Sequence, residues 1–335
     1  MRLLVYEFIT GGGLIGAPLP STLLREGAMM RDALLRGLSE LPELQLSLTR
    51  DPRCAWPLDS IAIERIEIRN GESPDAYFER ALQNVDVVWP IAPESGRALE
   101  RLATLARAAG KQVMLSDAAT LSICASKFET ARVLQSAGVN VVETCRAFAD
   151  VKTDTGKFVS KPDCGSGGEG IRLWANSGAA FQALPVGRQY SWVVQPWCEG
   201  ETLSLSLLCL NGVATLLSVN RQHVQWNDGG VALTGITVNA YSRHDEGFRS
   251  LAQEIARALA GLWGYIGVDF IREPDGTLRV LEINSRLTTS YCGLDRALGL
   301  NVSECVIRMA QSGSLPMLEI PIDQSVFLDL AAANV

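Results

Sequence analysis

The chain has 335 residues, a formal net charge of −7, a sequence pI near 5.1 and a hydrophobic share of 47%. This length suits about two or three domains, and the composition is that of a globular protein rather than a disordered or repetitive one. The acidic balance argues against non-specific nucleic-acid binding, which needs clustered lysine and arginine to neutralise phosphates.

The chain opens on an apolar run, LLVYEFI, that is too short for a membrane span and has no flank typical of a cleaved leader. We therefore expect a first strand there, in a cytoplasmic protein that does not enter a membrane. The eight cysteines include no C-x-x-C pair, so we predict reduced core thiols rather than a zinc site or a disulfide framework. With two histidines in the chain, histidine-based catalysis has few candidates.

Strand and helix signals alternate through the first part of the chain. We expect strands at 2–9, 44–49, 61–68, 85–91 and 111–116, and helices at 21–41, 73–84 and 94–109. This alternation predicts an N-terminal α/β domain over residues 1–117, with a mostly parallel, doubly wound sheet that places ligands at the carboxyl ends of its strands.

The second part of the chain is rich in strand signals. Ser126 and Glu129 form a capping-box pattern and Gly138 supplies a stop, which places Lys127 in the first turn of a helix. Beyond it we expect strands at 139–148, 157–162, 171–175, 190–197, 202–210, 213–221, 268–273 and 278–284, with helices at 246–262 and 301–312. This mostly antiparallel organisation predicts a separate α+β domain over residues 118–335.

A first glycine pattern, Gly11–Gly16, follows the first expected strand and matches G-x-G-x-x-G. That dinucleotide fingerprint needs a helix to open at the third glycine and an acidic residue about twenty positions on, at the end of the next strand. Here prolines delay the helix to Ser21, and Asp32 lies within that helix. A NAD-dependent oxidoreductase stays an alternative, and a substrate-lining or merely flexible loop is the favoured interpretation.

A second match to the pattern lies in KPDCGSGGEGI, residues 161–171, where a strand follows instead of a helix. The order of a P-loop is absent as well, because Lys161 precedes the glycines. A strand that ends in a lysine and leads into a glycine-rich loop can wrap its backbone around an anion. We predict a flexible flap over ATP phosphates, and an ordinary surface hairpin is the alternative.

The segment VDFIREPDGTLRVLEIN has the pattern of a hairpin around PDGT. A turn centred on residues 275–276 would place Asp269 opposite Glu282, with Asn284 on the same face as Glu282. Paired carboxylates repel unless a cation lies between them, and two carboxylates with an amide suit Mg²⁺. The alternative is that these are exposed hairpin residues with separate partners, and a one-residue slip in register would part the pair.

The segment VVQPWCEGE, between the flap and the hairpin, reads as a strand followed by an acidic turn. The backbone groups of Gln195, Pro196, Trp197 and Cys198 offer donors and acceptors to an adenine edge, and Glu201 offers a carboxylate to ribose hydroxyls. The alternative is an ordinary solvated turn.

In this order, SKFETARVLQSAGV, KPDCGSGGEGI, VVQPWCEGE and VDF with LEINSRLTTSY resemble the ATP-grasp superfamily of carboxylate–amine ligases, across residues 120–295. The resemblance implies a pre-ATP-grasp domain followed by a two-lobed ATP-grasp domain, with a smaller lobe at 118–194 that carries the flap and a larger lobe at 195–335 that carries the metal site. It also implies ATP and Mg²⁺ as cofactors, with Mn²⁺ as a further option.

The resemblance assigns roles to individual residues. It implies that phosphates are contacted by Lys127 and Lys161 and covered by Gly165, Ser166, Gly167 and Gly168, and that the nucleoside is held by Gln195, Pro196, Trp197, Cys198 and Glu201. It implies Asp269, Glu282 and Asn284 as metal ligands, and Lys161 and Arg286 as catalytic residues beside the reacting phosphate. One departure is Gln195 followed by Pro196, where relatives often have an acidic residue.

Within the superfamily, MRLLVYEFITGGG, REGAMM at 25–30 and EINSRLTTSYCGL are most similar to tyramine–glutamate ligases of methanofuran-type cofactor biosynthesis. This implies an amide formed through an acyl phosphate between the side-chain carboxylate of L-glutamate and tyramine or a similar amine. Candidate substrate contacts are Gly11, Gly12, Gly13, Arg25, Glu26, Arg221, Ser290 and Tyr291. A different amino acid and amine pair, or a non-catalytic ATP sensor, remain alternatives, and a homodimer is left open.

Overall fold

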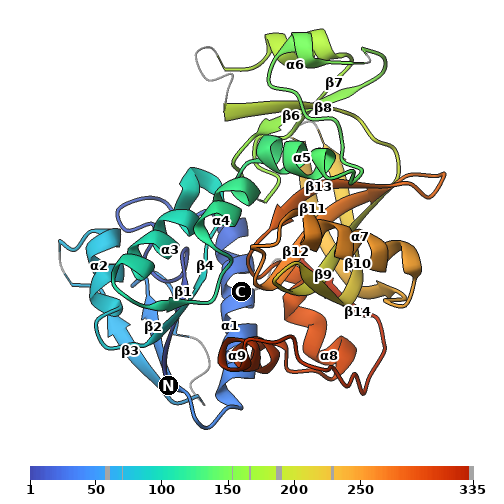
Figure 1. The fold of residues 1–335 in the computed structure, drawn as a ribbon. Helices are drawn as coiled ribbons and strands as arrows, with labels where there is room; N and C mark the ends of the chain where they lie inside the picture. The colour runs from blue at the N-terminus through green and yellow to red at the C-terminus, as the bar shows by residue number, and fades with distance from the viewer. Residues whose placement is uncertain are drawn as a thin grey trace.

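The structure is a computed structural model, and it describes residues 1–56, 61–69, 71–152, 154–165, 167–185, 191–227 and 230–331. In this part of the chain the strands form three sheets, of five, six and three strands. Figure 1 shows the five-stranded sheet beside the six-stranded sheet, with the three-stranded sheet set above both. The predicted order of a doubly wound domain followed by a two-lobed α+β domain is confirmed.

The five-stranded sheet is parallel and has the order β3-β2-β1-β4-β5. Its elements are β1 (Arg2–Glu7), α1 (Ser21–Ser39), β2 (Gln45–Arg50), β3 (Ile63–Glu67), α2 (Pro74–Ala81), β4 (Val87–Ile91), α3 (Ala98–Ala108) and β5 (Gln112–Val113). The strand order reverses between β1 and β4, and in such sheets the crevice at this point is where ligands bind. The loops that follow β1 and β4 therefore lie at the edge of the sheet where a ligand is expected.

The six-stranded sheet has the order β13-β12-β9-β10-β11-β14 and its pairs are antiparallel. Its strands are β9 (Glu201–Leu210), β10 (Val213–Asn227), β11 (Gly230–Tyr241), β12 (Gly264–Arg272), β13 (Leu278–Asn284) and β14 (Val326–Asp329). The accompanying helices are α7 (Glu246–Ala258), α8 (Leu294–Leu298) and α9 (Val302–Ser312). Apolar residues of β9 and β12 pack with α7 in one buried cluster, so the other face of this sheet is left for the cavity.

The three-stranded sheet has the order β7-β6-β8 and carries the glycine-rich loop. Its elements are β6 (Phe158–Pro162), β7 (Arg172–Trp174), α6 (Ser177–Gln182) and β8 (Trp192–Pro196), and α4 (Ala118–Ala125) and α5 (Lys127–Ser136) precede it. The fully buried part of its core is small: Phe158, Ala180, Leu184 and Val194. This sheet therefore rests on far fewer buried side chains than the other two.

Helix α1 joins the N-terminal sheet to the C-terminal part of the molecule. Figure 1 shows it between the five-stranded and six-stranded sheets, beside α9. Leu34 and Leu38 of α1 share one buried cluster with Leu298 and Ile307 from the far end of the chain. Helix α1 is therefore held at the boundary between the two main parts of the structure.

Some sequence predictions differ from the structure. Residues 139–148 do not form the predicted strand, because this segment makes single bridges to two different sheets, from Val141 to Val280 and from Cys145 to Val194. Helix α3 starts later than predicted, after a turn in which Gly96 and Arg97 have positive φ. The elements α4, α6, β11 and β14 were not predicted. No helix in the described ranges is long and apolar enough to cross a membrane.

The β12–β13 hairpin confirms the predicted pairing of Asp269 with Glu282, although the register at the turn differs from the predicted one. At the turn Arg272 pairs with Leu278, which is one residue out of the predicted register. A β-bulge then leaves Leu281 unpaired between Val280 and Glu282, and this extra residue restores the predicted register. The bulge therefore decides that both carboxylates face the same side.

Candidate functional site

A cavity of about 480 Å³ lies between the three-stranded and six-stranded sheets. Its walls come from α5, β6, the glycine-rich loop, β8, β9, β10, β11, β12 and β13, with further residues from α1 and from the segment after β13. This volume is in the range of cavities that hold a nucleotide-sized ligand. The residues predicted to bind the nucleotide and the metal can therefore be located relative to this one cavity.

Two carboxylates and an amide converge on the wall formed by the β12–β13 hairpin. Asn284 Nδ2 donates to Asp269 Oδ2 at 3.0 Å, and Gln222 Nε2 donates to Asp269 Oδ1 at 2.8 Å. Burial, followed by the negative charge of Glu282, raises the pKa of Asp269. Burial alone would raise the pKa of Glu282, but the charges of Lys127 and Lys161 lower it.

This donor set fits Mg²⁺, which prefers carboxylate and amide oxygens and keeps some waters in its shell. Asp269, Glu282 and Asn284 all line the cavity, so a bound ion would face the ligand space. A divalent cation between the carboxylates would favour the ionised form of both. In the described part of the chain no group of three or more His, Cys, Asp or Glu side chains is placed to hold a metal, so water or a ligand would complete the shell.

Two lysines face this cluster from the other side of the cavity. Lys127 Nζ lies 3.0 Å from Glu282 Oε2 and donates to the carbonyl of Gly165 at 2.8 Å. Burial opposes the charge of Lys127, but Glu282 raises its pKa above the ordinary value. Burial lowers the pKa of Lys161 to about 8, with Lys127 adding to the effect against the opposing charge of Glu282. The capped start of α5 and the end of β6 therefore bring both amines to one place.

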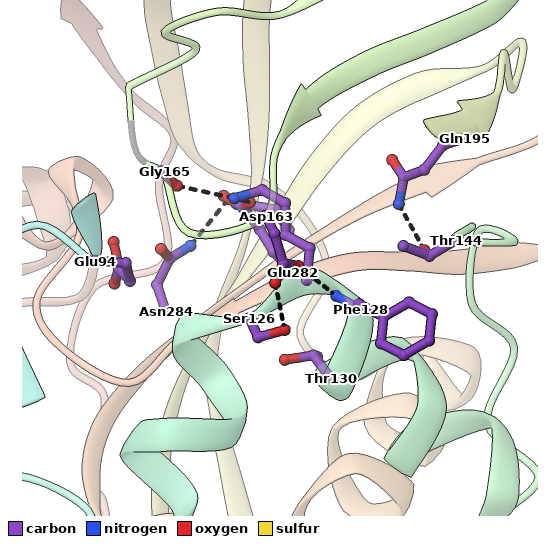
Figure 2. Close-up of polar contacts among 12 residues, drawn as sticks. Glu94, Ser126, Phe128, Thr130, Thr144, Asp163, Gly165, Gln195, Glu282 and Asn284 are labelled. Carbon is purple, nitrogen blue, oxygen red and sulfur yellow. Dashed lines mark hydrogen bonds and ion pairs between the residues drawn. The ribbon is translucent and has the colours of Figure 1, made fainter. Parts of the chain in front are cut away.

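The base of the glycine-rich loop is fixed by Asp163, which the sequence analysis did not single out. Its carboxylate accepts from Ser126 Oγ at 2.8 Å and from the backbone N–H of Phe128 at 2.9 Å, and it pairs with Arg146. Figure 2 shows Asp163 with Ser126 and Phe128, beside Glu282 and Gly165. Asp163 thus ties the loop to the amino end of α5 and sets the position of Lys127 relative to the loop.

The glycine flap, residues 165–171, covers the cavity from the side of β11. Gly165, Gly167 and Gly168 line the cavity, and Gly167 and Gly168 have φ of +67° and +74°. A Cβ on Gly168 would lie 3.2 Å from Val231 of β11, so the flap lies close against that strand. Ser166, which was predicted to cover phosphates, lies outside the described residues.

The end of β8 and the two residues after it line the cavity with Gln195, Pro196, Trp197 and Cys198. The side chain of Gln195 is directed to Thr144, with Nε2 donating to Oγ1 at 2.8 Å (Figure 2). The backbone N–H of Trp197 donates to the carbonyl of Lys157 at 2.8 Å, so that group is already used. The backbone N–H of Trp197 is therefore not free to contact adenine.

Glu201 and Arg221 do not line the cavity, contrary to the sequence prediction. The carboxylate of Glu201 accepts from Arg272 and from the Tyr241 hydroxyl and lies 3.3 Å from Arg221. Arg221 pairs across the sheet with Leu203, which packs in the α7 cluster. Both side chains therefore belong to the opposite face of the six-stranded sheet from the neighbouring cavity residue Gln222.

Arg286 lines the cavity and is held by Glu94, which the sequence analysis missed. Arg286 Nε donates to Glu94 Oε1 at 2.8 Å and Nη2 donates to Oε2 at 2.7 Å, an arrangement with two parallel bonds. The pKa of Arg286 is raised by the charge of Glu94, although burial acts the other way. Because Glu94 follows β4, the N-terminal sheet positions a guanidinium in the second domain.

The predicted substrate contacts divide into two groups. Glu26 and Ser290 line the cavity. Gly11, Gly12 and Gly13 pack against Glu7, Tyr77 and Phe8, and Tyr291 is buried against Tyr265. Arg25 donates to the backbone carbonyls of Leu330 at 2.7 Å and Asp329 at 2.9 Å, so it fastens α1 to the end of β14. The structure therefore gives packing roles to the members of the second group.

Comparison with protein families gives two matches. The family described as an ATP-grasp domain matches residues 124–290, and the family described as a pre ATP-grasp 3 domain matches residues 44–121. A search of the curated proteins finds no match to the sequence.

Solved structures similar to this one include an ATP-grasp superfamily protein from Archaeoglobus fulgidus, with a TM-score of 0.73 and 23% identity over 98% of this chain and 92% of that chain. L-amino acid ligase from Bacillus licheniformis gives a TM-score of 0.66 and 16% identity over 93% and 74% of the two chains. The biotin carboxylase domain of 2-oxoglutarate carboxylase from Hydrogenobacter thermophilus, crystallised with MgADP and bicarbonate, gives 0.68 and 15% over 96% and 71%. At these identities the likeness shows the fold, and the two family matches show that this chain belongs to the ATP-grasp superfamily of ATP- and Mg²⁺-dependent ligases.

Proposed function

We propose that this chain joins a carboxylate to an amine, through an acyl phosphate, at the cavity between the two ATP-grasp lobes. The observation that carries the proposal is the Asp269–Glu282 pair with Asn284, facing Lys127 and Lys161 across one cavity beneath the glycine flap. The two adjacent carboxylates suit a cation, and the two amines beside them suit an anion. Mg²⁺ bound to a nucleotide phosphate chain supplies both.

In this proposal Asp269, Glu282 and Asn284 hold Mg²⁺, which neutralises charge that develops on the phosphates. Lys127 and Lys161 bind the phosphate oxygens, and the flap keeps water away from the acyl phosphate. The reaction needs positioning and charge stabilisation rather than a protein nucleophile. This agrees with the burial of five cysteine thiols that are absent from the cavity wall, Cys124, Cys145, Cys209, Cys292 and Cys305.

Adenine would bind at the outer edge of β8. Successive peptide groups of an extended chain point to opposite edges. The N–H of Trp197 points to Lys157, directly before β6, and the N–H and C=O of Val194 both bond to Cys145 on the other side. The C=O of Pro196 and the N–H of Cys198 then lie on the side away from β6, as an acceptor and a donor for the base. The missing N–H of Pro196 removes no bond to β6.

For the substrates we propose the side-chain carboxylate of L-glutamate and the amine of tyramine, as in methanofuran-type cofactor biosynthesis. Support comes from the motif resemblance at residues 1–13, 25–30 and 282–294 and from the fold shared with an L-amino acid ligase. Trp226, which lines the cavity 5.0 Å from the ring of Trp197, gives an aromatic surface for such ligands.

The test is a screen of ADP release with Mg²⁺ and ATP, in which amino acids are crossed with amines and the amide is identified by mass. We expect ADP to form only when both an acid and an amine are present, with L-glutamate and tyramine as the leading pair. A different productive pair would correct the substrates and keep the reaction. Tight binding of Mg-ATP without ADP formation in any mixture would favour a non-catalytic ATP sensor.

A NAD-dependent oxidoreductase has little support from the Gly11–Gly16 turn. A Cβ on Gly13 would lie 2.2 Å from the ring of Phe8, and one on Gly11 would lie 2.3 Å from the carbonyl of Glu7. Protein atoms thus occupy the space that a pyrophosphate would need beside these glycines. Calorimetry with NAD and ATP checks this directly, and we expect heat from ATP alone.

A further inference from the structure

Glu26 brings a carboxylate from the N-terminal part of the chain to the cavity wall. It belongs to α1 and lines the cavity together with Arg286, Thr289 and Ser290. Thr289 Oγ1 donates to Glu26 Oε2 at 3.0 Å. This wall lies next to the metal cluster in the chain, because Arg286 follows Asn284 by two residues and also contacts its side chain at 3.4 Å. Glu26 therefore faces the space where substrates would meet the phosphates.

The position of Glu26 is fixed from both sides. Its neighbour Arg25 is anchored to the backbone carbonyls of Asp329 and Leu330. Its other neighbour, Gly27, lies so close to Glu7 that a Cβ there would be 2.6 Å from the carboxylate. These contacts thus fix the backbone of α1 at Glu26.

Glu26 is the carboxylate at this wall that lacks a balancing cation. Arg286 is paired with Glu94 and Lys127 is paired with Glu282. Among the residues that the structure describes, no lysine or arginine nitrogen lies within ion-pair distance of Glu26. Burial raises the pKa of Glu26 even though Thr289 and the charge of Arg286 act the other way. A partly buried carboxylate with one hydroxyl partner is stabilised when a ligand brings a positive charge.

We propose that Glu26 binds the ammonium group of a substrate, with Thr289 and Ser290 as neighbouring hydroxyl acceptors. The inference rests on the proposed ligase function and adds a specificity determinant to it. An ammonium group has several N–H donors and one positive charge, which matches a carboxylate flanked by hydroxyls. Two groups have this chemistry: the α-ammonium of the amino acid that is activated, and the incoming amine before it loses its proton.

The test compares the wild-type enzyme with Glu26→Gln, which keeps the side-chain size and an acceptor for Thr289. Steady-state kinetics use ATP with L-glutamate and tyramine, or with the pair that the screen identifies. Losing a charge-assisted hydrogen bond costs about 1.5–3 kcal/mol, so we expect the KM of one ammonium-bearing substrate to rise roughly 10- to 100-fold. The KM of ATP should stay unchanged, which separates this role from a structural one.

Two measurements distinguish which substrate supplies the ammonium group. If the α-ammonium of L-glutamate binds Glu26, glutarate, which lacks it, should react equally well with both enzymes. If the incoming amine binds Glu26, the KM of tyramine should rise while that of L-glutamate stays constant. Glu43→Gln, which removes one negative charge from the exposed end of the same domain, is the matched control and should leave all constants unchanged.

The outcomes separate the inference from the proposed function. If the wild type turns over and Glu26→Gln has the same KM for both substrates, the inference about Glu26 is wrong and the ligase function is kept. Absence of turnover by the wild type with every pair would overturn the function. In that case L-glutamate and tyramine are titrated by calorimetry into each enzyme with Mg-ADP present. Equal affinity of a substrate for the wild type and for Glu26→Gln, or no binding to either enzyme, would reject the role of Glu26.

Discussion

The three-stranded sheet and the six-stranded sheet face the same cavity and differ in what they offer to it. The three-stranded sheet contributes Lys161 and the glycine flap, over a core in which Phe158, Ala180, Leu184 and Val194 are fully buried. The six-stranded sheet contributes carboxylates from strands whose opposite face packs in a much larger cluster. A metal site needs fixed ligand positions, whereas a cover over a nucleotide must open, so the difference in packing follows the difference in task.

The largest effect is expected on the six-stranded side, from Glu282→Gln. The change removes one charge from the metal site, and metal-ion catalysis supplies several kcal/mol, so ligase activity should fall by about 1000-fold or more. The fold should be retained, because the amide still fits beside Asp269 and relieves the repulsion between two acids, but loss of the ion pair with Lys127 should lower the melting temperature. ADP release at varied Mg²⁺ is the measurement. Turnover within a few-fold of wild type would remove Glu282 from the metal site.

On the three-stranded side, Lys161→Met should cost less. Methionine keeps most of the length of the side chain and removes the charge that would meet the phosphates, so we expect kcat/KM for ATP to fall roughly 100- to 1000-fold. Because burial already disfavours the charge of Lys161, the variant should melt no lower than wild type. An unchanged kcat/KM for ATP would show that Lys161 of β6 does not contact the nucleotide.

A pair of core substitutions tests the difference in packing directly. Phe158→Ala in the small core and Phe270→Ala in the large one should each cost about 3–5 kcal/mol, since both rings are fully buried. We expect Phe158→Ala to increase hydrogen exchange in β6, β7 and β8 alone, and Phe270→Ala to lower the stability of the whole second domain. If Phe158→Ala increased hydrogen exchange in the six-stranded sheet as much as in the three-stranded sheet, the two sheets would not differ in local stability.

The smallest effect is expected from a pair of glycine substitutions. Gly168→Ala places a Cβ 3.2 Å from Val231 at a φ of +74°, so it should strain the flap by about 1–3 kcal/mol and raise the KM of ATP several-fold. Gly276→Ala at the β12–β13 turn has a similar φ of +88° and no atom within 4 Å. This control carries the backbone strain without the contact, and its KM for ATP should equal that of wild type.

The sequence predicted those parts of the site that local patterns control. The capping box placed Lys127 in the first turn of α5, and the hairpin pattern placed Asp269 opposite Glu282. Alternation along β13 put Asn284 with them, which the bond from Asn284 to Asp269 confirms. Each of these inferences used residues close in sequence, where turn geometry and strand period determine direction.

What the sequence could not predict depends on contacts between distant segments. Glu94 and Arg286 are 192 positions apart, and no local pattern relates them. Gln222 reaches Asp269 because β10 lies two strands from β12, and that order follows from the packing of the whole sheet. Glu201 was misplaced for the same kind of reason: in β9 the side facing α7 and the side facing the cavity are set by the strands around it.

The unpaired Leu281 has a practical consequence for protein engineering. The turn at residues 273–277 and the carboxylate pair lie on opposite sides of the bulge, in two different registers. An insertion of a label or a peptide at residues 274–276 would therefore be separated from the carboxylate pair by an irregularity that already absorbs one residue. If Leu281 were paired instead, it would lie opposite Asp269 and Glu282 would lie opposite Val268, which would turn the carboxylate toward the apolar interior.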